Sequence, residues 1–279
     1  MDKRNLKLVP GRNPGESPDP VPGTDSAAVS SASLAMPGTS RAAAILPLEL
    51  VDVGLVSGDA ALLKEINLAF GGDRTSVILG PNGAGKTLLL RICHGLLSPT
   101  TGKVRWRDPD LAMHPAAQGM VFQKPVVLRR SVEDNIRFAL KACRVERALH
   151  AGRLAHALEA SGLGPLAGRR AMHLSGGERQ RLSLARCLAV QHRVLFLDEP
   201  TAHLDPAATR RVEEMIALIH EDGTRVIMVT HDIGQARRLA DEIVFMHRGE
   251  VLESGPATDF FARPGTAEAA AYLRGDLIW

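Results

Sequence analysis

The sequence predicts an α/β fold in which helices cover a parallel β-sheet, with an antiparallel β subdomain ahead of it and an α-helical subdomain inserted into it. The first observation is a pair of short apolar runs within residues 193–200 and 224–232, each ending in polar residues, a pattern typical of strands buried on both faces of a parallel sheet. The second is the helical spacing between these runs, because strand, helix, strand is the order of a parallel crossover. The third is a glycine-rich loop at residues 80–85, which lies between another apolar run and another helical stretch.

The N-terminal part of the chain differs in composition from the rest. Residues 1–46 are rich in Pro, Gly, Ser and Ala, and they have scarcely an aromatic residue or a periodic apolar pattern. Such a segment buries too little apolar surface to offset the entropy of ordering. We therefore expect a disordered tail over residues 1–46 and a folded domain over residues 47–279.

Two strands are predicted at the start of this domain. Apolar and polar residues alternate in LPLELVDVGLV at 46–56, and the alternation returns in KEINLAF at 64–70 before a GGD turn. Both strands are expected to be antiparallel, because alternation is typical of strands with one face exposed. The run TSVILG at 75–80 then predicts a buried strand, and PNGAGKTLLLRICHGL at 81–96 predicts the helix after it.

A mainly helical segment is expected from about residue 125 to residue 190. It is rich in Ala, Leu and Arg, and GLGPLAG at 162–168 interrupts it. The next predicted helix begins at Pro206, is followed by Gly223 and carries an apolar stripe along one face. The stripe consists of Val212, Met215, Ile216 and Ile219. EIVFMHRGEVLESG at 242–255 predicts two final strands around an Arg-Gly turn.

Composition and charge narrow the possible classes of protein. Hydrophobic residues make up 45% of the 279 residues and charged residues 23%, and the net charge of +3 is too small to indicate a nucleic-acid partner. The three cysteines are widely spaced without a metal-ligand or redox pattern, which is typical of reduced thiols in the cytosol. No run reaches the roughly 18 to 20 apolar residues needed to span a bilayer. The basic N-terminus is not followed by the apolar core of a secretory signal.

Residues 80–87, GPNGAGKT, match the pattern of a phosphate-binding loop. Glycines let successive backbone amides point at phosphate oxygens, the helix start adds partial positive charge, and Lys86 adds a full charge. Thr87 can offer its hydroxyl to Mg²⁺. The expected nucleotide-binding residues are Gly80, Pro81, Asn82, Gly83, Ala84, Gly85, Lys86 and Thr87.

Polar side chains also follow other apolar runs. Asp198 is a candidate for the Mg²⁺ shell, and Glu199 for orienting and deprotonating an attacking water, although adjacent carboxylates can also cap a helix. His231 and Gln123 each follow a further predicted strand. Because the carboxyl ends of parallel strands form the edge at which such sheets bind ligands, these side chains are candidates for the same site.

A second glycine-containing segment, LSGGERQ at 174–180, looks like a phosphate site without its lysine. Ser175 and Glu178 fit a capping box at the start of a helix, which accounts for both without any ligand. The capping box gives no reason for Gly176 and Gly177, because paired glycines weaken the first helical turn unless a ligand needs the bare backbone.

In this order, the loop at 80–87, Gln123, LSGGERQ, LFLDEP, TAHLD and the histidine of VTHD resemble the motifs of ABC transporter ATP-binding subunits, over residues 48 to 255. The resemblance implies a P-loop NTPase (RecA-like) fold, an ATPase activity, and ATP and Mg²⁺ as ligands. It implies Glu199 as the base and His231 on the γ-phosphate. The implied catalytic residues are Lys86, Gln123, Glu199 and His231, and the implied metal-binding residues are Thr87, Gln123 and Asp198.

The resemblance also implies partners. In this family two such domains meet head to tail, so that the LSGGERQ segment of one, here called the signature (residues 174–180), covers the γ-phosphate held by the phosphate loop of the other. Ser175, Gly176 and Gly177 would act on the neighbour's nucleotide, and Asp205 would help to couple the two sites. The expected partners are a second copy of the chain, integral membrane permease subunits and, indirectly, an extracytoplasmic substrate-binding protein. We expect the chain in the cytoplasm, peripheral on the inner face of the cell membrane.

Two positions depart from the family pattern. An aromatic residue that stacks on adenine usually follows the first strand, but this chain offers only Val56 or a close neighbour. His203 stands in TAHLD where a small residue is commoner.

The transported substrate is predicted only from the resemblance to particular importers. FQKPVVLRRSVEDNIRFAL at 122–140 and AYLRGDLIW at 271–279 look most like tungstate-type oxyanion importers, with phosphate or molybdate importers as the alternative. A soluble ABC ATPase acting on ribosomes or DNA is an alternative of a different class. A third alternative is a small nucleotide kinase that uses the phosphate loop alone, but this function would not account for the LSGGERQ segment.

Overall fold

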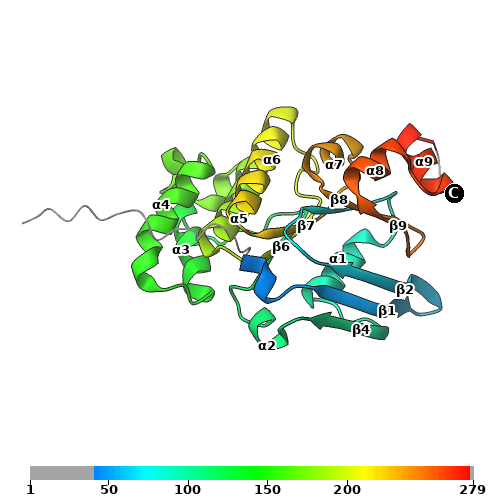
Figure 1. Ribbon diagram of the computed structural model, residues 1–279. Helices are drawn as coiled ribbons and strands as arrows, with labels where there is room; N and C mark the ends of the chain where they lie inside the picture. The colour runs from blue at the N-terminus through cyan, green and yellow to red at the C-terminus, as the bar shows by residue number, and fades with distance from the viewer. Residues whose placement is uncertain (1–40, 277–279) are drawn as a thin grey trace, which may run out of the picture. The chain divides into compact units, whose positions relative to one another are not determined.

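The computed structural model describes residues 41–276, which belong to one compact unit (Figure 1). Its α/β architecture has a mixed six-stranded sheet, an antiparallel three-stranded sheet and helices around both. This arrangement confirms the predicted fold class. None of the helices between residues 41 and 276 is both long and apolar enough to cross a bilayer.

The larger sheet has the strand order β5-β6-β7-β3-β8-β9. Its parallel strands are β3 (Ser76–Leu79), β5 (Gln118–Val121), β6 (Val194–Asp198), β7 (Arg225–Val229) and β8 (Glu242–His247). The last strand, β9 (Glu250–Pro256), runs antiparallel to β8. Because β3 lies between β7 and β8, the loop after β3 is brought next to the loops after strands that occur more than a hundred residues later in the chain.

Two helices connect or follow these strands as the sequence predicts. α1 (Lys86–His94) follows β3, and α6 (Pro206–Glu221) joins β6 to its parallel neighbour β7. The predicted stripe of α6 is buried: Val212, Met215, Ile216 and Ile219 are at most 4% exposed.

The smaller sheet has the order β2-β1-β4, formed by β1 (Leu48–Ser57), β2 (Ala60–Phe70) and β4 (Thr101–Trp106). The first two strands are the predicted pair. β4 carries the largely exposed sequence TGKVRW, which has little strand pattern of its own. It is a strand because it pairs with β1, with Leu48 opposite Trp106. A short helix, α2 (Pro109–Ala112), follows it.

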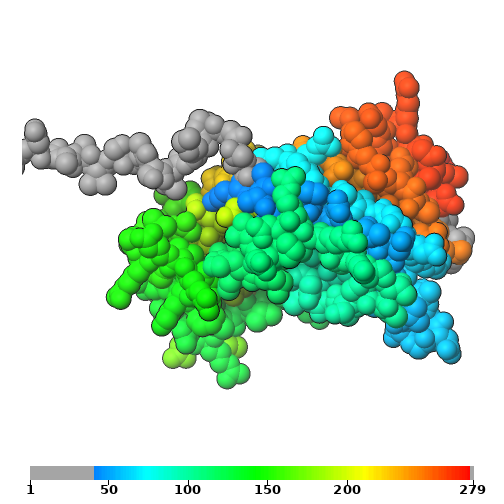
Figure 2. Space-filling view, turned by 60° about the horizontal axis from the view of Figure 1, so that its bottom comes forward, coloured from blue at the N-terminus to red at the C-terminus, as the bar shows by residue number. Residues whose placement is uncertain are grey.

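Helices α3 (Val132–Ala142), α4 (His150–Ala160) and α5 (Gly176–Val190) lie between β5 and β6, within the segment predicted to be helical. Ser131 caps α3 and Ser175 caps α5 through their side-chain oxygens. Helices α7 (Ile233–Leu239), α8 (Ala257–Ala262) and α9 (Ala267–Arg274) complete the chain. Figure 2 shows α3 and α4 in green at one end of the folded unit and the C-terminal helices in orange and red at the other.

The core lies on both faces of the larger sheet. Leu195 and Leu197 of β6 belong to the cluster that includes the helical segment and α6, whereas Phe196 between them belongs to the cluster that includes α1 and the antiparallel sheet. Since successive side chains of a strand point to opposite faces, a run buried at every position must be covered on both sides. This is the reason for the unbroken apolar pattern of the sequence.

The boundary of the predicted tail is wrong for residues 41–46, and residues 1–40 lie outside the described residues. Arg41–Ala44 form a 3-10 helix, and Ala42, Ile45 and Leu46 are at most 3% exposed in the core beside the antiparallel sheet. The carbonyl oxygen of Arg41 accepts a hydrogen bond of 2.7 Å from Nη1 of Arg193. These apolar contacts supply the burial that the composition of the segment did not indicate.

Candidate functional site

The phosphate loop connects β3 to α1 and is shaped by glycines. Gly80 has a φ of 152°, and a Cβ there would lie 2.1 Å from the carbonyl oxygen of Met246 on the neighbouring strand β8. Gly85, with a φ of 96°, is the N-cap of α1, and no side chain caps this helix. The amides of the first turn of α1 are therefore left for a ligand, as in helix starts that bind phosphate.

Lys86 is only 5% exposed and lies over the same loop. Its Nζ donates hydrogen bonds of 2.8 Å to the carbonyl oxygens of Gly80 and Pro81. Burial lowers the pKa of Lys86, while the nearby carboxylates of Glu199 and Asp198 raise it. A cation held at an uncapped helix start fits the phosphates of a nucleotide.

Oxygen ligands suitable for Mg²⁺ meet beside this loop. The Oγ1 hydroxyl of Thr87 donates a hydrogen bond of 2.7 Å to Oδ1 of Asp198, at the end of β6. Burial raises the pKa of Asp198, and the Thr87 hydroxyl and Arg91, 3.9 Å away, lower it. No cluster of three or more His, Cys, Asp or Glu side chains that could hold a metal occurs among residues 41–276. A hydroxyl and one carboxylate nevertheless suit Mg²⁺, which keeps several waters and phosphate oxygens as ligands.

Glu199 follows Asp198, and its carboxylate contacts two other predicted site residues, His231 and Gln123. Its Oε1 lies 3.2 Å from Nδ1 of His231, and its Oε2 accepts a hydrogen bond of 3.3 Å from Nε2 of Gln123. The Glu199 side chain is 16% exposed and that of His231 is 53% exposed. The loops after β5, β6 and β7 thus converge on one carboxylate, because these strands are parallel neighbours.

The backbone of Glu199 is also unusual. Its φ is 45°, in the left-handed region that non-glycine residues rarely adopt, and its N–H donates a hydrogen bond of 3.0 Å to the carbonyl oxygen of Val229. Residues held in such conformations are concentrated at functional sites, where the surrounding structure compensates for the strain.

The signature segment forms the start of α5, and its capping box is present. The Oγ of Ser175 accepts from the N–H of Glu178, and Oε2 of Glu178 accepts from the N–H of Ser175. This second hydrogen bond is the main cause that lowers the pKa of Glu178. The two glycines differ, however. A Cβ on Gly177 would lie 3.0 Å from Cβ of Ala208 on α6, whereas one on Gly176 would have no atom within 4 Å. Packing therefore explains Gly177 and leaves Gly176 without an internal reason.

The signature and the TAHLD loop line a common hollow of about 380 Å³. Asp205 caps α6 there, with its Oδ1 2.9 Å from the N–H groups of both Ala207 and Ala208. His203, with a φ of 64°, also lines the hollow. No residue of the phosphate loop lines it. Within one chain, the structure therefore brings the predicted site residues together in two groups, one around Lys86 and Glu199 and the other around Ser175.

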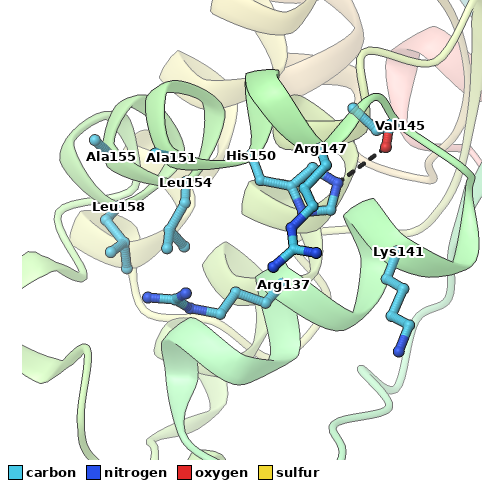
Figure 3. Close-up of a pocket in the computed structure, with 9 residues that line it drawn as sticks. All are labelled: Arg137, Lys141, Val145, Arg147, His150, Ala151, Leu154, Ala155 and Leu158. Atoms are coloured by element: carbon cyan, nitrogen blue, oxygen red, sulfur yellow. Dashed lines mark hydrogen bonds between the residues drawn. The ribbon is translucent and has the colours of Figure 1, made fainter.

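A larger hollow, of about 900 Å³, lies elsewhere in the described part of the chain, between α3 and α4 (Figure 3). Figure 3 shows Arg137 and Arg147 extending into it from opposite sides, while Nε2 of His150 lies 3.0 Å from the carbonyl oxygen of Val145. It contains neither a glycine-rich loop nor a carboxylate, nor any of the predicted site residues. It is therefore not a candidate for the nucleotide site.

Two residues near the site have no signal in the sequence pattern. Arg91, one helical turn after Thr87, lies 3.9 Å from Asp198. Tyr272 of α9 contacts the backbone of both Gly80 and His231. Arg91 is carried to the site by the helix that also carries Thr87. Tyr272 lies in the stretch 271–279, which was used only for the cargo resemblance, and long-range packing of α9 brings it to the site. Val56, which the sequence offers at or near the position of the missing aromatic residue, is 47% exposed near the end of β1.

Comparisons with known proteins show the family to which the chain belongs. A family model described as ABC transporter matches residues 63–202. The phosphate import ATP-binding protein PstB 2 of Natronomonas pharaonis is 37% identical over 236 residues, which cover 78% of this chain and 83% of that protein. PstB of Thermotoga maritima is 34% identical over 247 residues, with coverages of 82% and 98%. The ATP-binding cassette MJ0796, solved as a dimer in a post-hydrolysis state with ADP and Pi, is 28% identical, with a TM-score of 0.66 and coverages of 75% and 98%. The chain therefore belongs to the ABC transporter family, as an ATP-binding subunit that hydrolyses ATP.

Proposed function

We propose that this chain drives the import of an inorganic oxyanion and that the oxyanion is phosphate. The observation that supports this cargo is the pair of relatives at 37% and 34% identity, both named phosphate import ATP-binding proteins. Tungstate, the first expectation from the sequence, has no support among these relatives. They favour phosphate, which the sequence left as an alternative.

Within one chain, we propose that the phosphate loop and the loops after β5, β6 and β7 form the catalytic half-site. The amides of residues 80–87 and Lys86 bind the ATP phosphates. Glu199 deprotonates the attacking water, and Gln123 and His231 hold the Glu199 carboxylate and the γ-phosphate in position. Thr87, Asp198 and Gln123 hold Mg²⁺, which neutralises phosphate charge when bound.

We propose that the second half-site comes from another copy of the chain. The observation that carries this step is the hollow at Ser175, Gly176 and Asp205, which contains two helix starts but no residue of the phosphate loop. Gly176 presents bare backbone there without any packing reason. The relative solved as a dimer with ADP and Pi supports a two-chain arrangement. ATP would then join two copies and its hydrolysis would release them.

We infer that the opening and closing of this dimer acts on integral membrane permease subunits at the inner face of the membrane. An extracytoplasmic binding protein would deliver phosphate to those subunits. The import function named for the relatives supports these partners. No observation on this chain favours the ribosome or DNA as a partner.

Complementation between two inactive variants tests the shared site. Lys86→Ala disables the phosphate loop, and Gly176→Leu blocks the signature with a side chain that meets nothing in its own chain. Each variant alone should be inactive. A mixed dimer has one site in which an intact phosphate loop faces an intact signature. Because about half of the dimers in an equal mixture are mixed, and each has one of its two sites intact, the mixture should regain up to about a quarter of the wild-type ATPase rate. If mixing restores nothing, or if Gly176→Leu alone is fully active, the shared site is wrong.

The cargo is tested in vesicles that contain the chain with its membrane subunits and a binding protein loaded with one oxyanion. Phosphate should stimulate ATP hydrolysis and enter the vesicles, while tungstate and molybdate at equal concentrations should not. Stimulation and uptake with tungstate alone would restore the first expectation and reject the proposed cargo. Glu199→Gln serves as the control for uptake that does not depend on hydrolysis.

A further inference from the structure

Tyr272, the only tyrosine in the chain, connects the last described helix to two loops of the nucleotide site. Its hydroxyl donates a hydrogen bond of 3.0 Å to the carbonyl oxygen of His231 and lies 3.4 Å from the carbonyl oxygen of Gly80. The two loops follow β7 and β3, which are parallel neighbours. One hydroxyl from α9 therefore bridges the start of the phosphate loop and the backbone of the histidine that contacts Glu199.

Several contacts hold this hydroxyl in place. The Tyr272 ring lies 5.4 Å, between centroids, from the ring of Phe245 on β8. The N–H of Gly265, just before α9, donates hydrogen bonds of 2.9 and 3.0 Å to the two carboxylate oxygens of Glu253 on β9. Thr266 caps the helix through the N–H of Ala269. Because α9 is fixed at its start and in its last turn, the phenol has little freedom to leave the two carbonyls.

The phenol also remains a donor at all ordinary pH values. Burial, with the carboxylates of Asp232 and Glu199, raises the pKa of Tyr272 to about 12. A neutral hydroxyl has one proton to share between two carbonyl oxygens, so it can keep one partner when the other loop shifts. The carbonyl oxygen of Gly80 already accepts from Lys86, and that of His231 is the nearer of the two to the phenol, so the proton is directed to His231.

We infer that Tyr272 is a positioning residue of the ATPase, which acts through the backbone of His231 to hold the His231 side chain against Glu199 and the γ-phosphate. This inference rests on the proposed role of His231. It assigns to α9 a part in catalysis although α9 lies outside the segment that the family model matches, residues 63–202. The turnover rate, rather than the affinity for ATP, should depend on this hydroxyl, because the nucleotide phosphates are bound by other groups.

Tyr272→Phe is the sharpest test, because it removes the hydroxyl and keeps the ring against Phe245. Losing one neutral hydrogen bond to a positioned group should lower kcat about three- to tenfold, with KM for ATP changed less than about twofold. The decrease should be equal at pH 7 and pH 9, because the phenol is not titrated in this range. Arg274→Ala is the matched control on the same helix, since Arg274 pairs with the exposed Asp276. It should leave both constants unchanged.

A second arm separates positioning from a structural role. Tyr272→Phe should unfold at nearly the wild-type temperature, whereas Tyr272→Ala, which also removes the ring, should be less stable. In a His231→Ala background, measured by single-turnover hydrolysis, Tyr272→Phe should have no further effect, because the side chain through which it acts is gone. If the double variant instead loses rate by the product of the two single fold-reductions, Tyr272 does not act through His231 and the inference is overturned.

The remaining outcomes separate this inference from the proposed function. If His231→Ala lowers turnover but Tyr272→Phe does not, the inference alone is wrong. A loss in Tyr272→Phe that only follows a lower melting temperature means a structural role and also overturns it. If His231→Ala keeps the full rate, the proposed role of His231 is wrong, and the inference that rests on it is wrong as well.

Discussion

Oε1 of Glu199 lies 3.2 Å from Nδ1 of His231, and the two residues follow the adjacent parallel strands β6 and β7. The second carboxylate oxygen accepts from Gln123, which follows β5. A carboxylate held from both sides, on a backbone with a φ of 45°, is fixed in direction before any ligand binds. Such preorganisation is what a general base needs, because a misaligned base loses rate steeply.

We expect Glu199→Gln to keep ATP binding and to lose hydrolysis. The amide has a similar shape but cannot take a proton from water, and general-base catalysis contributes roughly 100- to 10,000-fold to a rate. The variant should elute as a dimer in the presence of ATP, because the nucleotide joining the two copies is not consumed. Steady-state hydrolysis, nucleotide binding and gel filtration measure these effects, with Glu221→Gln at the exposed end of α6 as the control. Hydrolysis at the normal rate by Glu199→Gln would rule out its role as the base.

Gly176→Ala should separate stability from activity. The added methyl group meets no atom of its own chain, and replacing a glycine in a helix by alanine tends to stabilise the fold by a few tenths of a kcal/mol. The same methyl group would obstruct the approach of the neighbour's phosphate, so ATP hydrolysis should fall by about tenfold or more. Gly168→Ala, which also meets no atom, should be silent in both measurements. Full hydrolysis by Gly176→Ala would show that the signature backbone is not used.

The unfolding free energy should fall as the pH is lowered from 7 to 4, with His192 as one identifiable cause. Burial lowers the pKa of His192 to about 4, from an ordinary value of about 6.5, and its Nδ1 lies 3.1 Å from the carbonyl oxygen of Ala116. Between these two pH values the unfolded chain binds a proton that the folded chain does not, so the folded state loses stability as pH falls. The loss is of order 3 kcal/mol over the full window.

Denaturant unfolding at pH 7 and pH 4.5 measures this dependence. His192→Gln should make the pH dependence shallower, although it lowers the stability at pH 7 by disturbing the packing of the ring on Gly119. The exposed His173→Gln is the control and should keep the wild-type slope. An unchanged slope in His192→Gln would mean that His192 is not the group responsible.

Two deletions should locate the start of the folded domain, which we propose at residue 41. Removing residues 1–40 should leave ATP hydrolysis nearly unchanged, as their composition suggests. Removing residues 1–46 also removes the buried Ile45 and Leu46, at about 1.5–3 kcal/mol for each large side chain. Thermal unfolding should therefore distinguish the two variants clearly. Equal stability of both would place the start after residue 46, and a large loss of activity in the shorter deletion would assign a function to the tail.

The sequence by itself determined the kinds of element and the chemistry each one carries. The apolar run before Asp198, the stripe of α6 and the loop at 80–87 are local patterns, because the period of burial and the needs of a phosphate are both expressed within a few consecutive residues. From these, an α/β fold with a phosphate-binding loop could be predicted, and the resemblance of the ordered motifs to ABC transporter ATP-binding subunits implied the ATPase activity. The capping box of Ser175 could also be predicted from the sequence, since all its atoms lie within four consecutive residues.

The tertiary structure decided which of these parts meet. Thr87 and Asp198 are 111 residues apart, and Tyr272 and Gly80 are 192 apart, so their contacts depend on the order β6-β7-β3-β8 and on the packing of α9. It also decided that Gly177 serves packing while Gly176 does not, and that residues 41–46 belong to the core. A local pattern cannot carry such information, because a contact between distant residues is selected by the whole arrangement of sheets and helices rather than by either residue's neighbours in the chain.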